Sequence, residues 1–215
     1  FAIVFVKLLC GGLGQNVFNP ALSARGFMML VAPAYMVRFE GLDGVTAATP
    51  LAAMHQGQLP NVTILDSFLG NIGGCIGETS ALLLLIGFVY LLARKVITAR
   101  IPLAYIGTVA VLSLLFPMGH DNLTWMGYQL FTGGLMLGAI FMATDYVTSP
   151  LTKLGQIVYG IGCGVLTIVI RYFGGYNEGV SYAILIMNCF VVLLDRIGRP
   201  TKFGAPAKVK KEAAK

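Results

Sequence analysis

The chain has 215 residues, of which 57% are hydrophobic and only 11% are charged. A soluble domain carries about 25% charged residues, so this composition excludes a domain that faces water on all sides. The mean hydropathy of +0.80 indicates an integral membrane protein instead. The net charge of +6 is no argument for nucleic-acid binding, because membrane proteins gather basic residues in their cytoplasmic loops.

The apolar segments predict an all-α fold, a polytopic bundle of transmembrane helices with broken or half helices among them. The chain starts in an apolar run. The next helix is predicted over residues 21–37, with Asn19 as its N-cap, Pro20 in its first turn and a kink at Pro33. The remaining candidates have about 15 to 20 residues each, near the length that crosses the hydrocarbon core. They are residues 76–92, 101–116, 126–142, 154–170 and 180–194.

One long polar-to-mixed segment, residues 38–75, interrupts these helices. It is much longer than an ordinary connection, which favours a functional role. Within it, Leu51 to Gln58 predicts a short helix at the membrane interface. We therefore divide the chain into a transmembrane domain, residues 1–198, which includes this loop, and a basic tail, residues 199–215.

The distribution of charges predicts the orientation in the membrane. With the 38–75 loop outside and the sides alternating, most basic residues and Arg25 fall inside, while only Arg38 and Arg171 fall outside. The acidic residues of the loops, Glu178 among them, fall outside. We therefore expect a multi-pass protein with an extracytoplasmic loop and a cytoplasmic C-terminus, whose tail lies near anionic lipid.

The most distinctive stretch of the loop is Asp43-Gly44-Val45-Thr46-Ala47-Ala48-Thr49-Pro50. Its spacing resembles the acceptor motif on which flavin transferases attach FMN through a phosphoester to a threonine hydroxyl. Thr49 would be the acceptor. Its small neighbours leave the hydroxyl within reach of a phosphorus atom, and Pro50 disfavours helical backbone at Thr49.

A simpler interpretation of the same stretch stays open at this point. It could be a proline-terminated turn before a helix that begins at Leu51, with Asp43 and Thr46 as capping groups. The motif alone does not decide between the two interpretations.

Five motifs, in this order along the chain, resemble those of one family. They are Gly11-Gly12-Leu13-Gly14-Gln15-Asn16-Val17-Phe18-Asn19-Pro20-Ala21-Leu22, the 43–50 stretch, Ile76-Gly77-Glu78-Thr79-Ser80, Phe141-Met142-Ala143-Thr144-Asp145 and Phe173-Gly174-Gly175-Tyr176-Asn177-Glu178-Gly179. The family contains the D subunit of the Rnf complex, a membrane-bound ferredoxin–NAD oxidoreductase that pumps Na⁺ or H⁺. It also contains the B subunit of the sodium-pumping NADH–quinone reductase. The ending from Asp195 to Gly204 favours the Rnf type. Because family members are longer at the N-terminus, we expect roughly a third of the protein to precede Phe1.

The resemblance implies a flavin-carrying subunit of a bacterial cytoplasmic-membrane translocase that passes electrons between partner subunits and is not catalytic alone. It implies FMN on Thr49, although Thr46 and Ala47 replace the commoner Ser and Gly of the motif. The residues expected near this cofactor are Asp43, Thr46, Ala48 and Thr49, with Arg38 as the nearest cation. The resemblance also implies a second, non-covalent flavin such as riboflavin, for which no residue identifies a pocket.

The glycine-rich stretch before Ser80 adds further candidates. It predicts a helix start whose backbone N–H groups could meet flavin or phosphate oxygens, which makes Gly77, Glu78 and Thr79 candidate contacts. An ordinary capped entry into a membrane helix explains it equally well. Asp145 and Glu78 are the acidic residues nearest the hydrocarbon region, and intramembrane carboxylates are candidates for an ion path. Both also lie near predicted helix ends, where water solvates them.

No metal site is predicted, since His55 and His120 match no ligand spacing and are interpreted as loop residues. The four cysteines are scattered and are interpreted as packing residues. Trp125, Tyr128, Tyr172 and Tyr176 resemble the aromatic belt at a membrane interface, although any of these rings could instead stack on a flavin.

The resemblance also implies partners. They are other membrane subunits, an outer-side flavin subunit, cytoplasmic iron–sulfur and NADH-binding subunits, and a flavin transferase for maturation. Two alternatives remain open. One is the B-type subunit of the sodium-pumping quinone reductase, and the other is a flavin-free channel or secondary transporter, whose broken helices would look alike.

Overall fold

A computed structural model of the chain describes residues 1–36, 50–74, 77, 79–175 and 178–197, and across these ranges it contains helices and no strand. The all-α prediction is therefore confirmed for this part of the chain. The elements are η1 (Ala2–Leu8), α1 (Pro20–Val31), α2 (Pro33–Met36), α3 (Pro50–His55), α4 (Ile64–Leu69), α5 (Ala81–Ala93), α6 (Arg100–Leu115), α7 (Asn122–Phe131), α8 (Leu135–Leu137), η2 (Gly138–Met142), α9 (Lys153–Phe173) and α10 (Val180–Leu194). The two η elements are π-helices.

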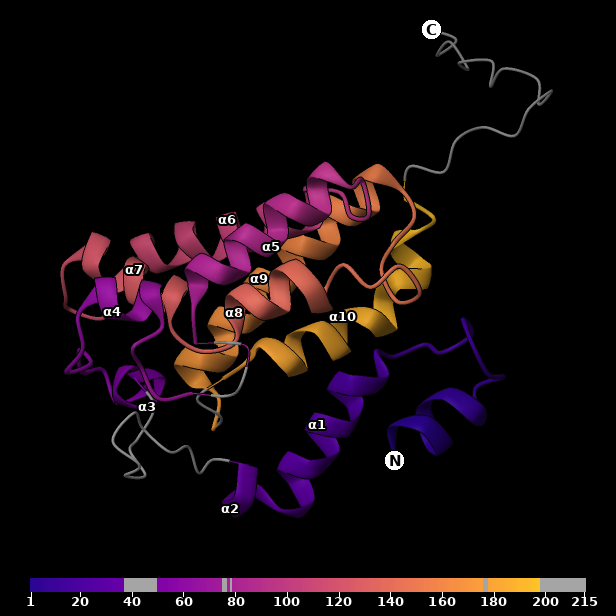
Figure 1. Cartoon of the computed structure of the whole chain (residues 1–215), viewed down its shortest axis with the longest axis horizontal. Helices are drawn as coiled ribbons and strands as arrows, with labels where there is room; N and C mark the ends of the chain where they lie inside the picture. Colours follow the sequence, from indigo (N-terminus) through magenta and orange to yellow (C-terminus); the bar gives the residue numbers. More distant parts are fainter. Residues whose placement is uncertain (37–49, 75–76, 78, 176–177, 198–215) are drawn as a thin grey trace, which may run out of the picture.

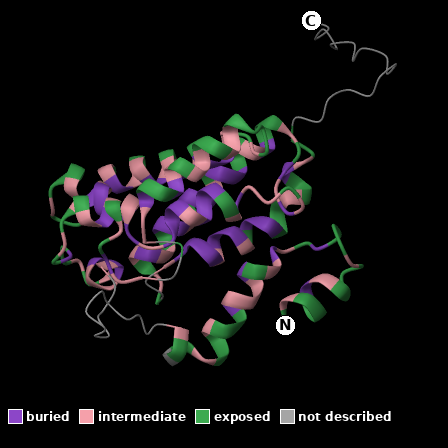
Figure 2. Ribbon diagram, in the orientation of Figure 1, coloured by how far each residue is buried: buried purple, intermediate pink, exposed green. Residues whose placement is uncertain are grey.

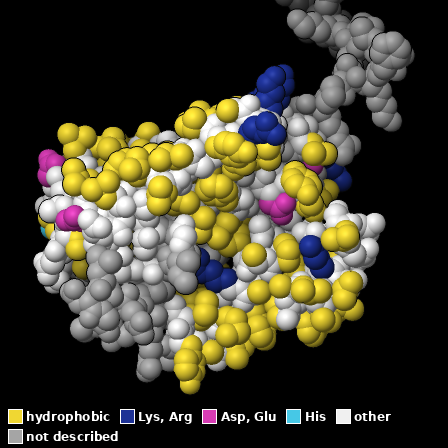
Figure 3. Space-filling view, viewed as in Figure 1, with side chains coloured by type: hydrophobic (Ala, Val, Ile, Leu, Met, Phe, Trp, Pro, Cys, Tyr) yellow, Lys and Arg dark blue, Asp and Glu magenta, His cyan; other side chains and the backbone are white. Residues whose placement is uncertain are grey.

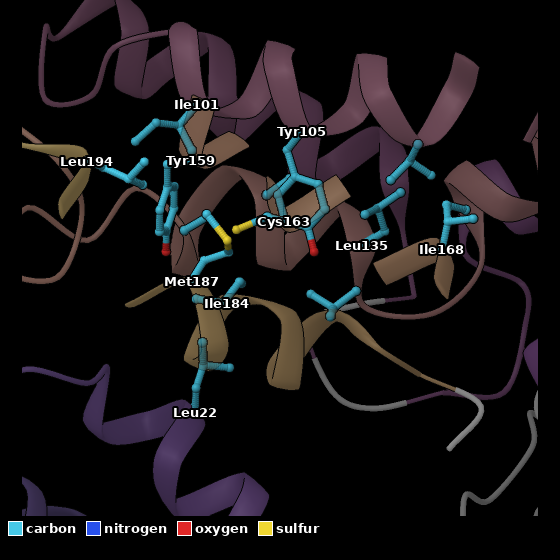
Figure 4. Close-up of a cluster of buried hydrophobic side chains, with 14 residues drawn as sticks. Leu22, Ile101, Tyr105, Leu135, Tyr159, Cys163, Ile168, Ile184, Met187 and Leu194 are labelled. Carbon is cyan, nitrogen blue, oxygen red and sulfur yellow. The ribbon is translucent and has the colours of Figure 1, made fainter. Parts of the chain in front are cut away.

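The bundle is built around α9. Helices α5, α6, α9 and α10 extend along the long axis, while α3, α4 and α7 gather at one end (Figure 1). The most extensive helix pair among the described elements is α6 with α9, followed by α9 with α10. Their facing sides form the main hydrophobic core, in which Tyr105, Tyr159, Cys163 and Ile184 are fully buried (Figure 4).

Helix α9 has an apolar outer face and a small or polar inner face. Its exposed residues include Leu154, Ile157, Ile161, Val165 and Val169. Its buried residues are Gly155, Tyr159, Gly160, Cys163, Gly164, Thr167, Ile168 and Arg171. A helix that faces water shows the reverse arrangement, whereas membrane helices place small and polar residues at their contacts. This surface agrees with that of a membrane helix.

The other helices repeat this outward apolar surface. Exposed and buried positions alternate around the helices (Figure 2), and hydrophobic side chains form broad patches on the face in Figure 3. Among the described residues, α9 is long and apolar enough to cross a membrane, and α1, α5, α6 and α10 are shorter apolar helices. The described helices therefore agree with a membrane bundle.

The α6–α9 contact depends on glycine, and this leads to a first prediction. A Cβ at Gly160 would lie 2.7 Å from Ala104 Cβ and 2.8 Å from the Ile101 carbonyl oxygen. We expect Gly160→Ala to lower the free energy of unfolding by about 1–3 kcal/mol, as overpacking does. Thermal unfolding in detergent measures this. Gly107→Ala on α6 is the matched control, because nothing lies within 4 Å of its Cβ position. An equal loss in both variants would contradict the packing argument.

The second predicted helix is confirmed at its start and shorter at its end. Asn19 Oδ1 accepts hydrogen bonds from Ala21 N and Leu22 N, as its N-cap role requires. The helix ends at Val31, and Pro33 opens the separate element α2. The expected kink is thus a break. A residue before proline is driven from helical backbone, and Ala32 has φ −140° and ψ 58°.

Two further predicted helices differ from the structure. Helix α5 begins at Ala81 and not at residue 76, because Ser80 caps it through Leu83 N at 3.4 Å and Gly77 has φ +88°. The helix predicted over 126–142 is divided into α7, α8 and η2. In contrast, α10 spans 180–194 as predicted, and the short helix α4 was not predicted.

Candidate functional site at a broken helix

Helix α3 follows directly on Thr49, and its buried face fixes it to the end of the bundle. Leu51 and Met54 are 4% and 2% exposed and pack with Trp125 and Tyr128 in one hydrophobic cluster. This confirms a short helix in the loop. The acceptor-motif residues Asp43, Thr46, Ala48 and Thr49 lie outside the described residues, as do Arg38 and Glu78.

Both histidines hold the α3 segment through backbone carbonyls. His55 Nε2 lies 2.7 Å from the Gly174 carbonyl oxygen, and His120 Nε2 lies 2.8 Å from that of Gly57. Because a carbonyl oxygen only accepts, each ring donates from Nε2. The described residues contain no cluster of three or more metal-ligating side chains. The histidines thus fasten α3 at its end to α9 and at the following turn to the start of α7.

The aromatic residues beneath α3 form a hydrogen-bonded support. Trp125 is 0% exposed, stacks on His120 with ring centroids 5.3 Å apart, and donates from Nε1 to Tyr172 Oη at 2.8 Å. Tyr172 donates in turn to the Phe116 carbonyl at 2.9 Å, and Tyr128 donates to that of Val62 at 2.6 Å. The interface-belt prediction is wrong for Trp125, because its N–H group finds a partner inside the protein. Tyr176 lies outside the described residues.

A break between α7 and α8 lies next to α3. Helix α7 ends at Phe131, Thr132 is extended with φ −104° and ψ 148°, and Gly133 has φ +69°. A Cβ at Gly133 would lie 2.8 Å from Leu51 Cδ2 and 3.3 Å from Arg171 Nη2. Only glycine combines this backbone with this closeness. The break, α3 and α9 therefore meet at Gly133.

The guanidinium of Arg171 binds the carbonyl end of the broken helix. Its Nη1 donates to the Gln129 carbonyl at 2.6 Å and to Gln129 Oε1 at 2.8 Å, and its Nη2 lies 3.4 Å from the Thr132 carbonyl. These contacts satisfy carbonyls that a helix end leaves without partners. Arg171 is 3% exposed. The side chain therefore turns into the bundle, and the assignment of Arg171 to the outer side stays a prediction.

The carboxylate of Glu178 binds the other side of the break. Its Oε1 accepts from Gly134 N at 2.6 Å, and its Oε2 accepts from Arg25 Nη2 at 2.6 Å. The two charged side chains are 15% and 21% exposed, respectively. Arg25 and Glu178 were predicted on opposite sides of the membrane. That prediction is wrong, because paired atoms share one depth.

The remaining candidates lie in local structure. Asp145 accepts from Val147 N at 3.3 Å and from Thr148 Oγ1 at 3.1 Å, which closes a turn after η2. A place on an ion path stays a prediction. Gly77 is exposed and Thr79 half-buried. Since α5 starts at Ala81, their N–H groups do not form the expected helix start, and their contact with flavin stays a prediction.

Helix α7, which carries several residues of this region, is capped at its N-terminus by Asp121. Hydrogen bonds from Thr124 N at 3.1 Å and Thr124 Oγ1 at 2.9 Å hold the pKa of the Asp121 carboxyl below its usual value. The cap is therefore ionised at neutral pH. A carboxylate at this position complements the positive end of the helix dipole.

The sequence was compared with those of known proteins. The sequence matches the NQR2, RnfD, RnfE family over residues 1–204. It is 47% identical to the D subunit of the Na(+)-translocating ferredoxin:NAD(+) oxidoreductase complex of Acetobacterium woodii, over 99% of this chain and 67% of that protein. It is 42% identical to the D subunit of the proton-translocating complex of Clostridium ljungdahlii, over 94% and 66%, and 38% identical to the D subunit of the ion-translocating oxidoreductase complex of Stutzerimonas stutzeri, over 98% and 70%. The chain thus spans about two thirds of the length of these relatives. It belongs to the NQR2, RnfD, RnfE family.

Proposed function

We propose that this chain is the D subunit of an ion-translocating ferredoxin:NAD⁺ oxidoreductase complex and that it carries FMN on Thr49. The observation that carries the proposal is the 47% identity to a D subunit of this kind along almost the whole chain. All three relatives above are named as D subunits, which favours this assignment over the B-type subunit of the quinone reductase. One relative is named for Na⁺ and another for protons, so their names leave the ion open.

The described residues that follow Thr49 support a flavin attachment at this position. A covalently held cofactor needs a fixed attachment point so that electron-transfer distances are constant. Helix α3 supplies one, because Leu51 and Met54 anchor its buried face and His55 fastens its end. FMN would supply the redox chemistry, and the protein would supply its position.

The proposed orientation keeps the α3 loop outside and the C-terminus inside. Removing Arg25, Arg171 and Glu178 from the charge count leaves this arrangement in place. Arg100 Nη1 donates to Gln156 Oε1 at 3.1 Å, and Leu151 N donates to Asp195 Oδ1 at 2.8 Å. The basic ends of α6, α9 and α10 therefore lie together, as a cytoplasmic surface that contacts the iron–sulfur and NADH-binding subunits would require. The outer-side flavin subunit and a second, non-covalent flavin belong to the same proposal.

The decisive test is flavin fluorescence on a denaturing gel. The protein is produced together with its flavin transferase, and the band is examined under ultraviolet light. We expect a fluorescent band for the wild type and none for Thr49→Val, which has nearly the same shape but no hydroxyl to esterify.

Thr98→Val is the matched control, because it removes the hydroxyl of an exposed threonine outside the motif and should keep the fluorescence. A dark wild-type band would contradict the flavin proposal and favour a flavin-free channel or transporter. A band that stays fluorescent in Thr49→Val would move the attachment to another residue.

A further inference from the structure

We propose that the break between α7 and α8 is a cation site that the protein occupies with its own Arg171 guanidinium, so that the break is closed to Na⁺. The inference goes beyond the proposed function and does not depend on a flavin at Thr49. It concerns what the charged groups at the break do in a membrane.

The atoms around the guanidinium are those that bind alkali cations in membrane proteins. Among the described residues, three oxygens accept from Arg171, namely the Gln129 carbonyl, Gln129 Oε1 and the Thr132 carbonyl, over distances of 2.6 to 3.4 Å. Unwound backbone carbonyls and the C-terminal ends of half-helices are the usual ligands of Na⁺ in transporters. Here a tethered cation holds the same kind of position.

The surroundings make a positive group necessary at this point. The carbonyl end of the ten-residue helix α7 carries a partial negative charge, and the site is buried, with Arg171 only 3% exposed. Buried carbonyl oxygens without a partner are costly. If the guanidinium were absent, a small cation would be the chemical group best suited to take its place.

The glycine at the break lets the guanidinium reach these oxygens. A Cβ at Gly133 would lie 3.3 Å from Arg171 Nη2, so a larger residue would crowd the side chain. On the N–H side of the break, Glu178 binds Gly134 N and Arg25. The chain thus supplies a positive charge to the carbonyl side of the break and a negative charge to its N–H side. A fixed cation cannot dissociate, which separates this site from a transport site.

Replacing Arg171 should convert the site into one that binds free Na⁺. The full-length protein is purified in detergent, and thermal unfolding is followed by the loss of helical circular dichroism in NaCl and in choline chloride of equal concentration. We expect the unfolding midpoint of Arg171→Ala to rise with Na⁺ concentration and not with choline, because a ligand that binds only the folded state stabilises it.

The wild type and Arg171→Lys, which keeps a tethered cation, should respond equally to the two salts. Arg94→Ala is the control for loss of an exposed positive charge and should also respond equally. An Arg171→Ala protein that responds alike to Na⁺ and choline would overturn the proposal. A variant that cannot be recovered folded in either salt would overturn it as well, because free Na⁺ would then be unable to replace the guanidinium.

Discussion

Replacing Gly133 by alanine is expected to destabilise the protein by roughly 2 to 5 kcal/mol, from two separable costs. The first is conformational, because Gly133 has φ +69° and an L-residue in left-handed backbone costs about 1–2 kcal/mol. The second is steric, because the new Cβ would lie 2.8 Å from Leu51 Cδ2 and 3.3 Å from Arg171 Nη2. Displacing Leu51 or Arg171 disturbs α3 or the carbonyl end of α7. Thermal unfolding in detergent measures the total.

Gly57→Ala separates the two costs. Gly57 has a similar φ of +72°, but nothing lies within 4 Å of its Cβ position. Its substitution should cost only the conformational part, about 1–2 kcal/mol. If Gly133→Ala is no more destabilising than Gly57→Ala, the close contact at the break has no energetic weight.

Replacing Glu178 by leucine should lower the free energy of unfolding by about 3 kcal/mol, the lower part of the range for breaking a buried ion pair. The carboxylate accepts from both Arg25 Nη2 and Gly134 N at 2.6 Å. Its loss removes the bond between α1 and the start of α10, and it leaves Gly134 N without this acceptor. The partial exposure of the pair, 21% and 15%, is the reason for the lower value. Unfolding midpoints of the purified protein give the measurement.

Two companion variants identify which contact matters. Glu178→Gln keeps an oxygen for Gly134 N but removes the charge, so its loss should be smaller than that of Glu178→Leu. In a double-mutant cycle with Arg25→Met, the combined loss should be less than the two single losses added together, because both remove the same pair. Strict additivity would show that Arg25 and Glu178 do not depend on each other.

Sequence patterns predicted a helix correctly where an apolar run or a capping residue is enough to determine it. The apolar run over 180–194 and the Asn19 cap both gave the observed elements. The break at Gly133 was missed because Gly133-Gly134 in an apolar run fits a close helix contact as well as an interruption. What decides is the presence of Leu51 and Arg171 beside it, and both come from distant parts of the chain.

The charge count failed at the Arg25–Glu178 pair for a physical reason. It assigns each charge to the aqueous side that its helix end faces, whereas these two side chains turn into the bundle and bind each other. Arg25 and Glu178 are 153 residues apart, so no local pattern shows that they pair. A sequence signal did exist, since Arg25 is a single charge within an otherwise uncharged helix and such a charge usually has a partner.

The way α3 is fastened also has a consequence for synthesis. His55 binds the carbonyl of Gly174, which lies 119 residues later in the chain, and Gly57 binds His120, which lies 63 residues later. At 5–20 residues per second, Gly174 is made roughly 6 to 24 s after His55. During that interval, Thr49 has left the ribosome while the support of the helix that follows it is still incomplete. The α3 segment is therefore synthesised before His120 and Gly174, the residues that hold it in place.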